Sequence, residues 1–237
     1  MGLRRVYRKY VVKTARTLTY HGLVVPLRRS GMTQSVAEHL YCDLYEVPEI
    51  NGLQAVVAEG DTVLELGAGL GIITALAARK AGRGRVISYE ANPAIIDDTR
   101  AFLASNGIAS VDLRAGVLVR EDVPAGATRT FYLAPSFAEG SLKHGAGQAV
   151  EVPATTLARV MAEVRPDVLI CDIEGAEADL LTGLDASGLR AAVIELHPHI
   201  LTRSDVAAIY ETMARHRLFP AIEHSGGTVV VFSRVSR

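Results

Sequence analysis

Three closely spaced glycines lie in the segment ELGAGLG, residues 65–71. They directly follow the short apolar run TVLEL at 62–66, which predicts a strand. Gly67 and Gly69 allow the backbone to turn and to approach a ligand where a Cβ atom would intrude. Gly71 allows a following helix to pack tightly. The spacing is G-x-G-x-G, which differs from the G-x-G-x-x-G turn that seats the pyrophosphate of a dinucleotide. The segment predicts a ligand-binding turn, although such glycines also occur in ordinary strand-to-helix connections.

Carboxylates near this turn indicate which ligand it would accept. Glu65 lies at the end of the first predicted strand, residues 62–66. Its charge there would repel a pyrophosphate but attract an ammonium or sulfonium group. Glu90 stands 25 residues further on, at the end of the next predicted strand. A carboxylate at that place can accept hydrogen bonds from both hydroxyls of a ribose. A free ribose without a phosphate is the chemical profile of S-adenosylmethionine, which we expect as the cofactor, with S-adenosylhomocysteine as the product.

A second group of polar residues follows two later apolar strands, and we expect the catalytic residues Asp172, Glu195 and His197 in it. If the methyl group of such a cofactor were transferred to a hydroxyl, the hydroxyl proton would have to be removed as the oxygen attacks. Asp172 could be that base, a metal ligand or an anchor for the substrate, or it could only cap the next helix together with Glu174. His197 could take a proton near neutral pH, or it could only hydrogen-bond a neighbouring loop. Asp172, Glu195 and His197 could also support a divalent cation, but residue types alone give no geometry, and we expect no metal.

Alternating strands and helices must position these residues. Short apolar runs at 62–66, 85–90, 111–114, 167–172 and 191–196 predict strands, and helical patterns follow at 72–80, 93–106, 176–184 and 204–217, the last with Ser204 as its cap. A further helix is predicted at 155–164. The irregular segment 117–150 is expected to contain an edge hairpin or a lid over the acceptor, and 218–233 a closing hairpin.

This order predicts a doubly wound α/β fold with a mostly parallel seven-stranded sheet and an antiparallel strand from the C-terminal hairpin. Residues 1–58 are expected to be mainly helix and loop. We therefore divide the chain into a basic N-terminal helical extension, residues 1–45, and a catalytic domain, residues 46–237.

The charge of the chain is unevenly distributed. Eight Lys and Arg residues and no Asp or Glu precede Glu38, although the formal net charge of the whole chain is −1. A basic arm could meet phosphates, an anionic lipid surface or an acidic substrate. The simpler interpretation, which we favour, is an arm that packs on its own acidic domain or on a second subunit of a homo-oligomer. Nucleic-acid binding is not favoured, because the remaining chain is acidic and carries no recognition motif.

Length and composition exclude several classes of protein. The chain has 237 residues, 49% of them hydrophobic and 22% charged, which excludes a disordered chain. No apolar run approaches the ~18 residues of a membrane span, and no secretory signal is recognisable. Two cysteines, Cys42 and Cys171, cannot form a disulfide framework. We expect a cytoplasmic protein.

Four segments in this order resemble the FkbM-type S-adenosylmethionine-dependent methyltransferases: ELGAGLG at 65–71, YEANP at 89–93, CDIEGAE at 171–177 and IELHP at 194–198. The resemblance spans about Tyr45 to the C-terminus. It implies a class I methyltransferase Rossmann-like fold and methyl transfer to an oxygen of a small molecule or saccharide. Many members have a lysine where this chain has Cys171, so no role of that lysine can be carried over.

The resemblance also places Glu46 at the methionine end of the cofactor, Ala91 and Asn92 at the adenosine, and Gly116 at the adenine. The predicted cofactor contacts are therefore Glu46, Glu65, Gly67, Ala68, Gly69, Gly71, Glu90, Ala91, Asn92, Gly116 and Asp172. Two other functions remain open: an NAD(P)-dependent oxidoreductase on a similar sheet, and a non-catalytic module that binds S-adenosylmethionine.

Overall fold

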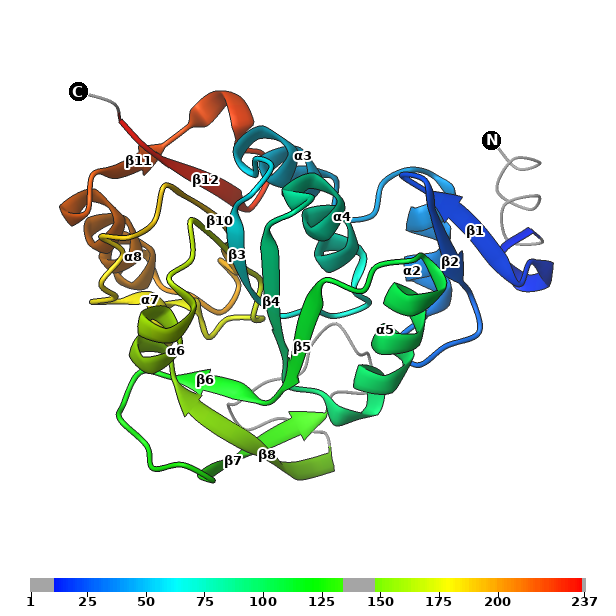
Figure 1. Ribbon diagram of the computed structural model, residues 1–237, viewed down its shortest axis with the longest axis horizontal. Helices are drawn as coiled ribbons and strands as arrows, with labels where there is room; N and C mark the ends of the chain where they lie inside the picture. Colours follow the sequence, from blue (N-terminus) through cyan, green and yellow to red (C-terminus); the bar gives the residue numbers. More distant parts are fainter. Residues whose placement is uncertain (1–10, 134–147, 236–237) are drawn as a thin grey trace.

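The computed structural model describes residues 11–133 and 148–235 and is built around a seven-stranded sheet (Figure 1). The strand order is β11-β12-β10-β9-β3-β4-β5, and β12 runs against both of its neighbours while the other strands are parallel. The predicted doubly wound sheet with an antiparallel closing strand is therefore confirmed. The bounds are β3 Thr62–Leu66, β4 Arg85–Glu90, β5 Val111–Ala115, β9 Val168–Cys171, β10 Ala191–Glu195, β11 Leu218–Pro220 and β12 Val229–Arg234.

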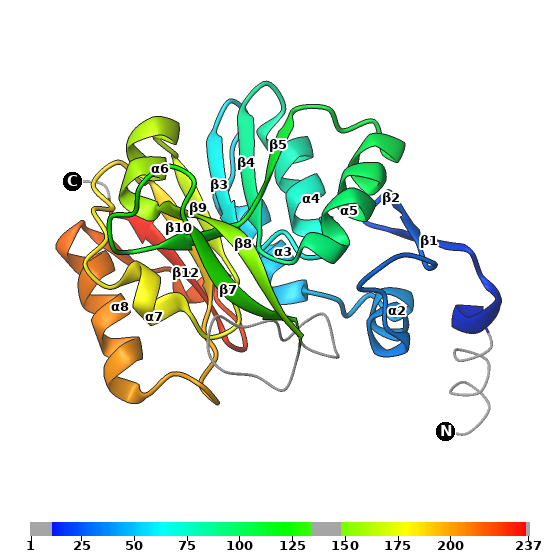
Figure 2. The ribbon, with the colours of Figure 1, turned by 90° about the horizontal axis from the view of Figure 1, so that it is seen from below.

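Helices cover both faces of this sheet (Figure 2). Along β10, Val193 packs in the core on one face, whereas Ala192 and Ile194 pack in the core on the other, as the alternation of side chains in a strand requires. Burial on both faces explains why the central strands are continuous apolar runs. One side carries α3 Val47–Val56, α4 Ile72–Ala81 and α5 Pro93–Ser105, and the other α6 Leu157–Val164, α7 Glu177–Leu181 and α8 Arg203–Arg215.

The N-terminal segment differs from the predicted helix and loop. Residues 11–14 are helical, but β1 Thr17–Tyr20 and β2 Leu23–Pro26 form an antiparallel hairpin before α2 Gln34–Tyr41. His21 and Gly22 both have positive φ, which suits a two-residue hairpin turn. Tyr20 and Leu23 are buried in the same apolar cluster as α3 and α4. This part of the predicted extension therefore shares a core with the sheet.

A second, three-stranded sheet lies at the end of β5. It contains β6 Val117–Val119, β7 Thr128–Leu133 and β8 Gln148–Thr156, in the order β6-β8-β7. The antiparallel pair β7 and β8 confirms the edge hairpin predicted in this segment. The predicted acceptor loop falls partly on residues 134–147, and Arg4, Arg5, Arg8 and Lys9 of the basic arm belong to residues 1–10. Both ranges lie outside the described residues.

The start of α8 corrects a further detail. Thr202, and not Ser204, caps this helix, because its side chain accepts from the Asp205 amide while the Asp205 carboxylate accepts from the Thr202 amide. This reciprocal capping box satisfies two amides that the helix leaves free. Among residues 11–133 and 148–235, no helix is long and apolar enough to cross a bilayer.

Candidate cofactor and acceptor site

A cavity lies at the carboxyl ends of β3, β4 and β9, the edge at which open α/β sheets bind ligands. It contains eight of the eleven predicted cofactor contacts. Glu65, Ala68 and Gly71 do not line it. Its described lining is Tyr45, Glu46, Leu66, Gly67, Gly69, Tyr89, Glu90, Ala91, Asn92, Ile95, Gly116, Val117, Leu118, Phe131, Asp172, Ile173, Glu174, Ala176 and Leu180.

Two residues of the glycine turn, Gly67 and Gly69, line this cavity, and both have a positive φ. Gly67 has a φ of +91°, and a Cβ atom on it would stand 1.8 Å from the carbonyl oxygen of Asp172. The amides of Gly67 and Ala68 both donate to the Tyr89 carbonyl, at 2.9 and 3.0 Å. A Cβ atom on Gly71 would stand 2.7 Å from Thr99 Cγ2, which confirms that Gly71 serves helix packing. The turn is thus fixed between β4 and β9.

Arg29, from the basic N-terminal segment, supports the turn from behind. Its Nη1 donates to the Leu70 carbonyl at 3.0 Å and its Nη2 to Thr99 Oγ1 at 2.9 Å. Thr99 Oγ1 in turn donates to the Gly69 carbonyl at 3.0 Å. The guanidinium also stacks over Phe102, 5.1 Å from the ring centroid. The arm therefore packs, at this residue, on its own domain, as the simpler interpretation of its charge predicted.

We expect Arg29→Ala to lower the free energy of unfolding by about 1–3 kcal/mol, because it removes two hydrogen bonds from a charged donor and leaves the turn unsupported. Chemical denaturation measures this value. Arg28→Ala is the matched control, since Arg28 is exposed and, within the described part of the chain, donates to the Lys13 carbonyl alone. Equal stability of the two variants would contradict the supporting role of Arg29.

Glu65 lies beneath the turn and not in the cavity. Only 1% of the residue is exposed, and its Oε2 accepts hydrogen bonds from Thr74 Oγ1 at 2.6 Å and from Ser88 Oγ. Burial raises the pKa of Glu65 from 4.5 to about 7, although the bonds from Ser88 and Thr74 oppose this shift. Glu65 therefore holds β3, β4 and α4 together. The direct contact with a ligand ammonium predicted from the sequence does not match this placement.

The raised pKa of Glu65 predicts a pH-dependent stability. At a pH between about 4.5, the pKa of Glu65 in the unfolded chain, and about 7, its pKa in the folded protein, the folded state binds more protons than the unfolded state. The free energy of unfolding therefore decreases as pH rises through this range. Glu65→Gln keeps an acceptor for Thr74 and Ser88 without the charge. We expect it to be more stable than wild type by about 1–3 kcal/mol at about pH 8, with most of this difference lost near pH 4.5. Urea unfolding at a series of pH values measures the difference. A constant difference would contradict the assignment.

Glu90 is buried at the end of β4, and backbone amides fix its carboxylate. Oε2 accepts from the Gly69 amide and Oε1 from the Asn92 amide, both at 2.7 Å. Asn92 Oδ1 accepts from the Ala94 amide at 3.0 Å, so Asn92 lines the cavity and also caps α5. Burial raises the pKa of Glu90, which these amides partly oppose. The lone pairs that remain on the two oxygens suit a pair of ribose hydroxyls.

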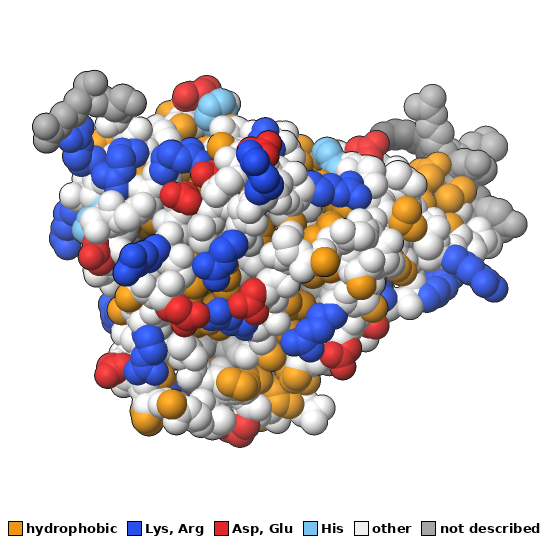
Figure 3. Space-filling model, viewed as in Figure 1, with side chains coloured by type: hydrophobic (Ala, Val, Ile, Leu, Met, Phe, Trp, Pro, Cys, Tyr) orange, Lys and Arg blue, Asp and Glu red, His pale blue; other side chains and the backbone are white. Residues whose placement is uncertain are grey.

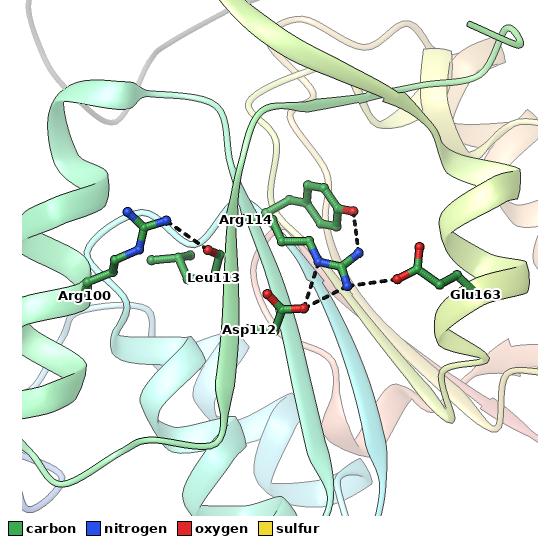
Figure 4. Close-up of polar contacts among 6 residues, drawn as sticks. Arg100, Asp112, Leu113, Arg114 and Glu163 are labelled. Carbon is green, nitrogen blue, oxygen red and sulfur yellow. Dashed lines mark hydrogen bonds and ion pairs between the residues drawn. The ribbon is translucent and has the colours of Figure 1, made fainter. Parts of the chain in front are cut away.

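Tyr89 and Phe131 give this end of the cavity an aromatic character. Arg114 positions the Tyr89 ring, since its Nη1 donates to the Tyr89 hydroxyl at 3.0 Å (Figure 4). The guanidinium is itself held by Asp112 and by Glu163, each at 2.9 Å. Sequence analysis missed Arg114, because its partner Glu163 lies 49 residues further on.

The other end of the cavity depends on the N-terminal hairpin. Tyr20 in β1 donates its hydroxyl proton to the Tyr45 carbonyl at 2.5 Å, and Tyr45 and Glu46 both line the cavity. Glu46 has a left-handed φ of 48° at the start of α3. Although it retains surface toward the cavity, the surrounding protein raises the pKa of Glu46 well above 4.5 by desolvation. Its hydrogen bond with Tyr45 opposes this shift.

Asp172 directly follows β9 and lines the cavity together with Glu46, whose pKa its charge helps to raise. Its amide donates to the Leu66 carbonyl at 2.9 Å, which fixes the residue beside the glycine turn. Desolvation, followed by the charges of Glu195 and Glu174, raises the pKa of Asp172 well above 3.8. Asp172 Oδ1 is buried without a hydrogen-bond partner among the described residues.

His197 lies among carboxylates. Its Nδ1 is 2.8 Å from Glu177 Oε1, and its Nε2 is 3.2 Å from Glu174 Oε2 and 3.6 Å from Asp172 Oδ1. Burial acts to lower the pKa of His197, but the bonds to Glu174 and Glu177 outweigh it and raise the pKa to about 10. The imidazole is therefore a cation near neutral pH. It cannot accept a proton there, so the predicted role of His197 as a base does not fit its surroundings.

Glu195 does not line the cavity. Its Oε1 accepts from Thr228 Oγ1 at 2.9 Å, and it lines a neighbouring groove together with Glu49. β10 ends at Glu195, and the charges of Glu195 and His197 both act on Asp172 and on Glu49. Sequence analysis also missed Glu49, which lies inside α3 and is only 7% exposed.

Asp172, Glu177 and His197 offer ligand atoms that lie within 4.8 Å of one another, a spacing that could hold a metal ion. This set differs from the Asp172, Glu195 and His197 considered from the sequence. Both ring nitrogens of His197 already face carboxylates, and the imidazolium provides these acids with a positive charge. In this arrangement the three side chains form one network of close polar contacts with Glu174.

Four carboxylates, Glu46, Glu90, Asp172 and Glu174, line the cavity, and no Lys, Arg or His belongs to its described lining. Such an electrostatic environment opposes a pyrophosphate and favours a ligand of net positive charge.

The fold is similar to that of several solved structures. Precorrin-6y C5,15-methyltransferase from Geobacter metallireducens has a TM-score of 0.48 and 12% identity, with 80% of this chain and 88% of that chain covered. A SAM-dependent methyltransferase from Aquifex aeolicus has a TM-score of 0.43 and 12% identity, with 80% of this chain and 90% of that chain covered. Ribosomal protein L11 methylase from Lactobacillus delbrueckii subsp. bulgaricus has a TM-score of 0.45 and 14% identity, with 86% of this chain and 79% of that chain covered.

No protein of curated function matches the sequence. The methyltransferase FkbM domain matches residues 65–219, which is more than half of the chain and includes the glycine turn, Glu90, Asp172 and His197. The chain therefore belongs to the FkbM methyltransferase family, and its methyl donor is S-adenosylmethionine.

Proposed function

We propose that this methyltransferase transfers a methyl group to a hydroxyl oxygen of a small molecule or saccharide. The acidic cavity carries this proposal, since its four carboxylates lie at the sheet edge without a basic residue in the described lining. The acidic lining and the membership in a methyltransferase family both count against an NAD(P)-dependent oxidoreductase. A non-catalytic binding module would need no carboxylate at the acceptor side, where Asp172 stands.

Residues of three strand ends would hold the cofactor. Glu90 would accept the ribose hydroxyls, with Tyr89, Phe131 and Gly116 around the adenine. Gly67 and Gly69 allow the backbone to approach the ligand closely. Glu46, on the opposite side, would receive the ammonium of the methionine moiety. When bound, S-adenosylmethionine supplies an electrophilic methyl group on a sulfonium sulfur.

Asp172 would act on the acceptor. Its carboxylate would orient the hydroxyl for in-line attack and take the proton as the new oxygen–carbon bond forms and the bond from carbon to sulfur breaks. A carboxyl of raised pKa is a stronger base than an ordinary aspartate. His197 is a positioning residue in this scheme, because it holds Glu174 and Glu177 and lies 3.6 Å from Asp172 Oδ1.

The raised pKa of Asp172 predicts the pH dependence of turnover. Protonation removes the base, so kcat is expected to fall as pH decreases through that pKa, at a pH above the ordinary titration range of aspartate. The profile of kcat against pH measures this limb. The same profile in Asp172→Asn should lack it, and a limb that survives in the variant would assign the titration to another group.

The O-methyl assignment is tested with a carbon-13 label in the methyl group of S-adenosylmethionine. A panel of sugar and small-molecule acceptors is incubated with the enzyme, and the carbon shift of the product identifies the methylated atom. We expect an O-methyl signal and an equal amount of S-adenosylhomocysteine. An N-methyl or C-methyl signal would overturn the oxygen assignment.

A further inference from the structure

A second concave surface, which we call the acidic groove, adjoins the cofactor cavity. Tyr45 and Glu46 line both, so a molecule in the groove lies next to the methionine end of the cofactor site. The groove measures about 520 Å³ and lies between α2, the start of α3 and the end of β10. This position suits the molecule that accepts the methyl group.

Three carboxylates line the groove: Glu46, Glu49 and Glu195. Within the described lining there is no Lys or Arg, and the single histidine, His39, is exposed to solvent. The nearest buried cation, His197, already faces Glu174 and Glu177. The charge of His197 also lowers the pKa of Glu49, so this one cation is shared between the groove and the carboxylates that it already faces.

Glu49 is the second observation that points to a ligand. The residue is 7% exposed, and its Oε2 is buried without a hydrogen-bond partner in the described part of the chain. A buried carboxylate oxygen without a donor is costly for a folded protein. Desolvation raises the pKa of Glu49 to about 7, and the charge and a hydrogen bond of Glu195 add to this shift, whereas a backbone hydrogen bond and the charge of His197 oppose it. The Glu49 carboxyl thus meets Glu195, while its Oε2 is left for a donor from a ligand.

From the groove's position, its carboxylates and the orphan oxygen of Glu49, we propose that the acceptor carries a protonated amine, which Glu49 and Glu195 bind while Asp172 faces the hydroxyl to be methylated. An ammonium group has three donors and a positive charge, so it can bond both carboxylates at once. The chemical class is an amino sugar or an amino alcohol. This inference rests on the proposed function, because it describes the acceptor of the same reaction.

The test compares three sugars of closely related shape: glucosamine, N-acetylglucosamine and glucose. Binding of each is measured by calorimetry to the full chain saturated with S-adenosylhomocysteine. We expect glucosamine to bind at least about 10-fold more tightly than the two neutral sugars, from a charge-assisted hydrogen bond that they cannot form. Glu49→Gln should abolish this preference and leave the affinity for S-adenosylhomocysteine unchanged.

Two further variants guard against a folding defect. Glu195→Gln changes a less buried partner of the same amine and should weaken glucosamine binding in the same direction. Glu223→Gln, a carboxylate that is 72% exposed and outside the groove, should change nothing. Equal or tighter binding of a neutral sugar, or no binding of any of the three, would overturn the inference. So would stoichiometric binding of Mg²⁺ or Mn²⁺ that Glu49→Gln removes. Failure of the proposed function is distinct, since it would appear as an N-methyl or C-methyl product.

Discussion

Asp172→Asn is expected to lower kcat by about 10²–10⁴-fold, the usual contribution of a positioned base. The amide keeps the size of the side chain but cannot take a proton at neutral pH. Asp172 is the carboxylate at the end of β9 that lines the cavity and carries a strongly raised pKa. Formation of S-adenosylhomocysteine under saturating conditions measures the effect.

Binding of S-adenosylhomocysteine by Asp172→Asn should remain within about 10-fold of wild type, because Glu90 and the glycine turn are unchanged and the product lacks the sulfonium charge. Asp185→Asn is a suitable control, since Asp185 is 80% exposed and does not line the cavity. Turnover of Asp172→Asn within about twofold of wild type would exclude Asp172 as the base.

Glu90→Gln is expected to weaken binding of S-adenosylhomocysteine by about 10–100-fold. The loss has two sources: the charge that strengthens the bonds to two ribose hydroxyls, and the acceptor oxygen that the Gly69 amide now uses. Calorimetric titration measures the dissociation constant, and a thermal melt without ligand reports whether the turn itself is destabilised.

Two further variants serve as controls for Glu90→Gln. Glu90→Asp keeps the charge and tests the reach of the side chain. Asp97→Asn removes a carboxylate that is 96% exposed on α5, close to Glu90 in sequence but outside the cavity. If Glu90→Gln bound S-adenosylhomocysteine as wild type does, the ribose would have to be held elsewhere.

The sheet was predictable because its signals are local. The apolar runs at β3, β4, β9 and β10 are short and are buried on both faces, and each begins within a residue or two of its predicted position. The hairpin β1–β2 was not predicted. Its strands are four residues long, and its core contacts are with helices far along the chain. No periodicity within residues 17–26 reveals such contacts.

The site shows the same division. Glu90, Gly67 and Asp172 were predictable because each ends a strand or follows one directly. Glu49 lies inside α3, and its place in the groove depends on the packing of that helix, which the sequence pattern does not determine. Glu195 ends β10 but lines the groove and not the cavity. His197 was correctly associated with Asp172, but its chemistry follows from Glu174 and Glu177, which place carboxylates on both ring nitrogens. A histidine surrounded in this way holds its proton.

The N-terminal segment illustrates a third case, in which the favoured interpretation of the charge agrees with the structure at Arg29. Acidic and basic side chains are interspersed over the face shown in Figure 3. The most informative basic residue of the segment is Arg29, which is directed inward to Leu70 and Thr99 and not toward a partner. Arg29 and Tyr20 hydrogen-bond to the glycine turn and to Tyr45, so the segment supports the cavity, and the predicted boundary at residue 45 falls between the two lining residues Tyr45 and Glu46.

The most direct test of the central claim is a calorimetric titration of the wild-type chain with S-adenosylhomocysteine, run beside NAD and NADP. The acidic cavity predicts saturable binding of S-adenosylhomocysteine at one site and no binding of either dinucleotide. Binding of a dinucleotide in preference to S-adenosylhomocysteine, or no binding of S-adenosylhomocysteine, would contradict the account.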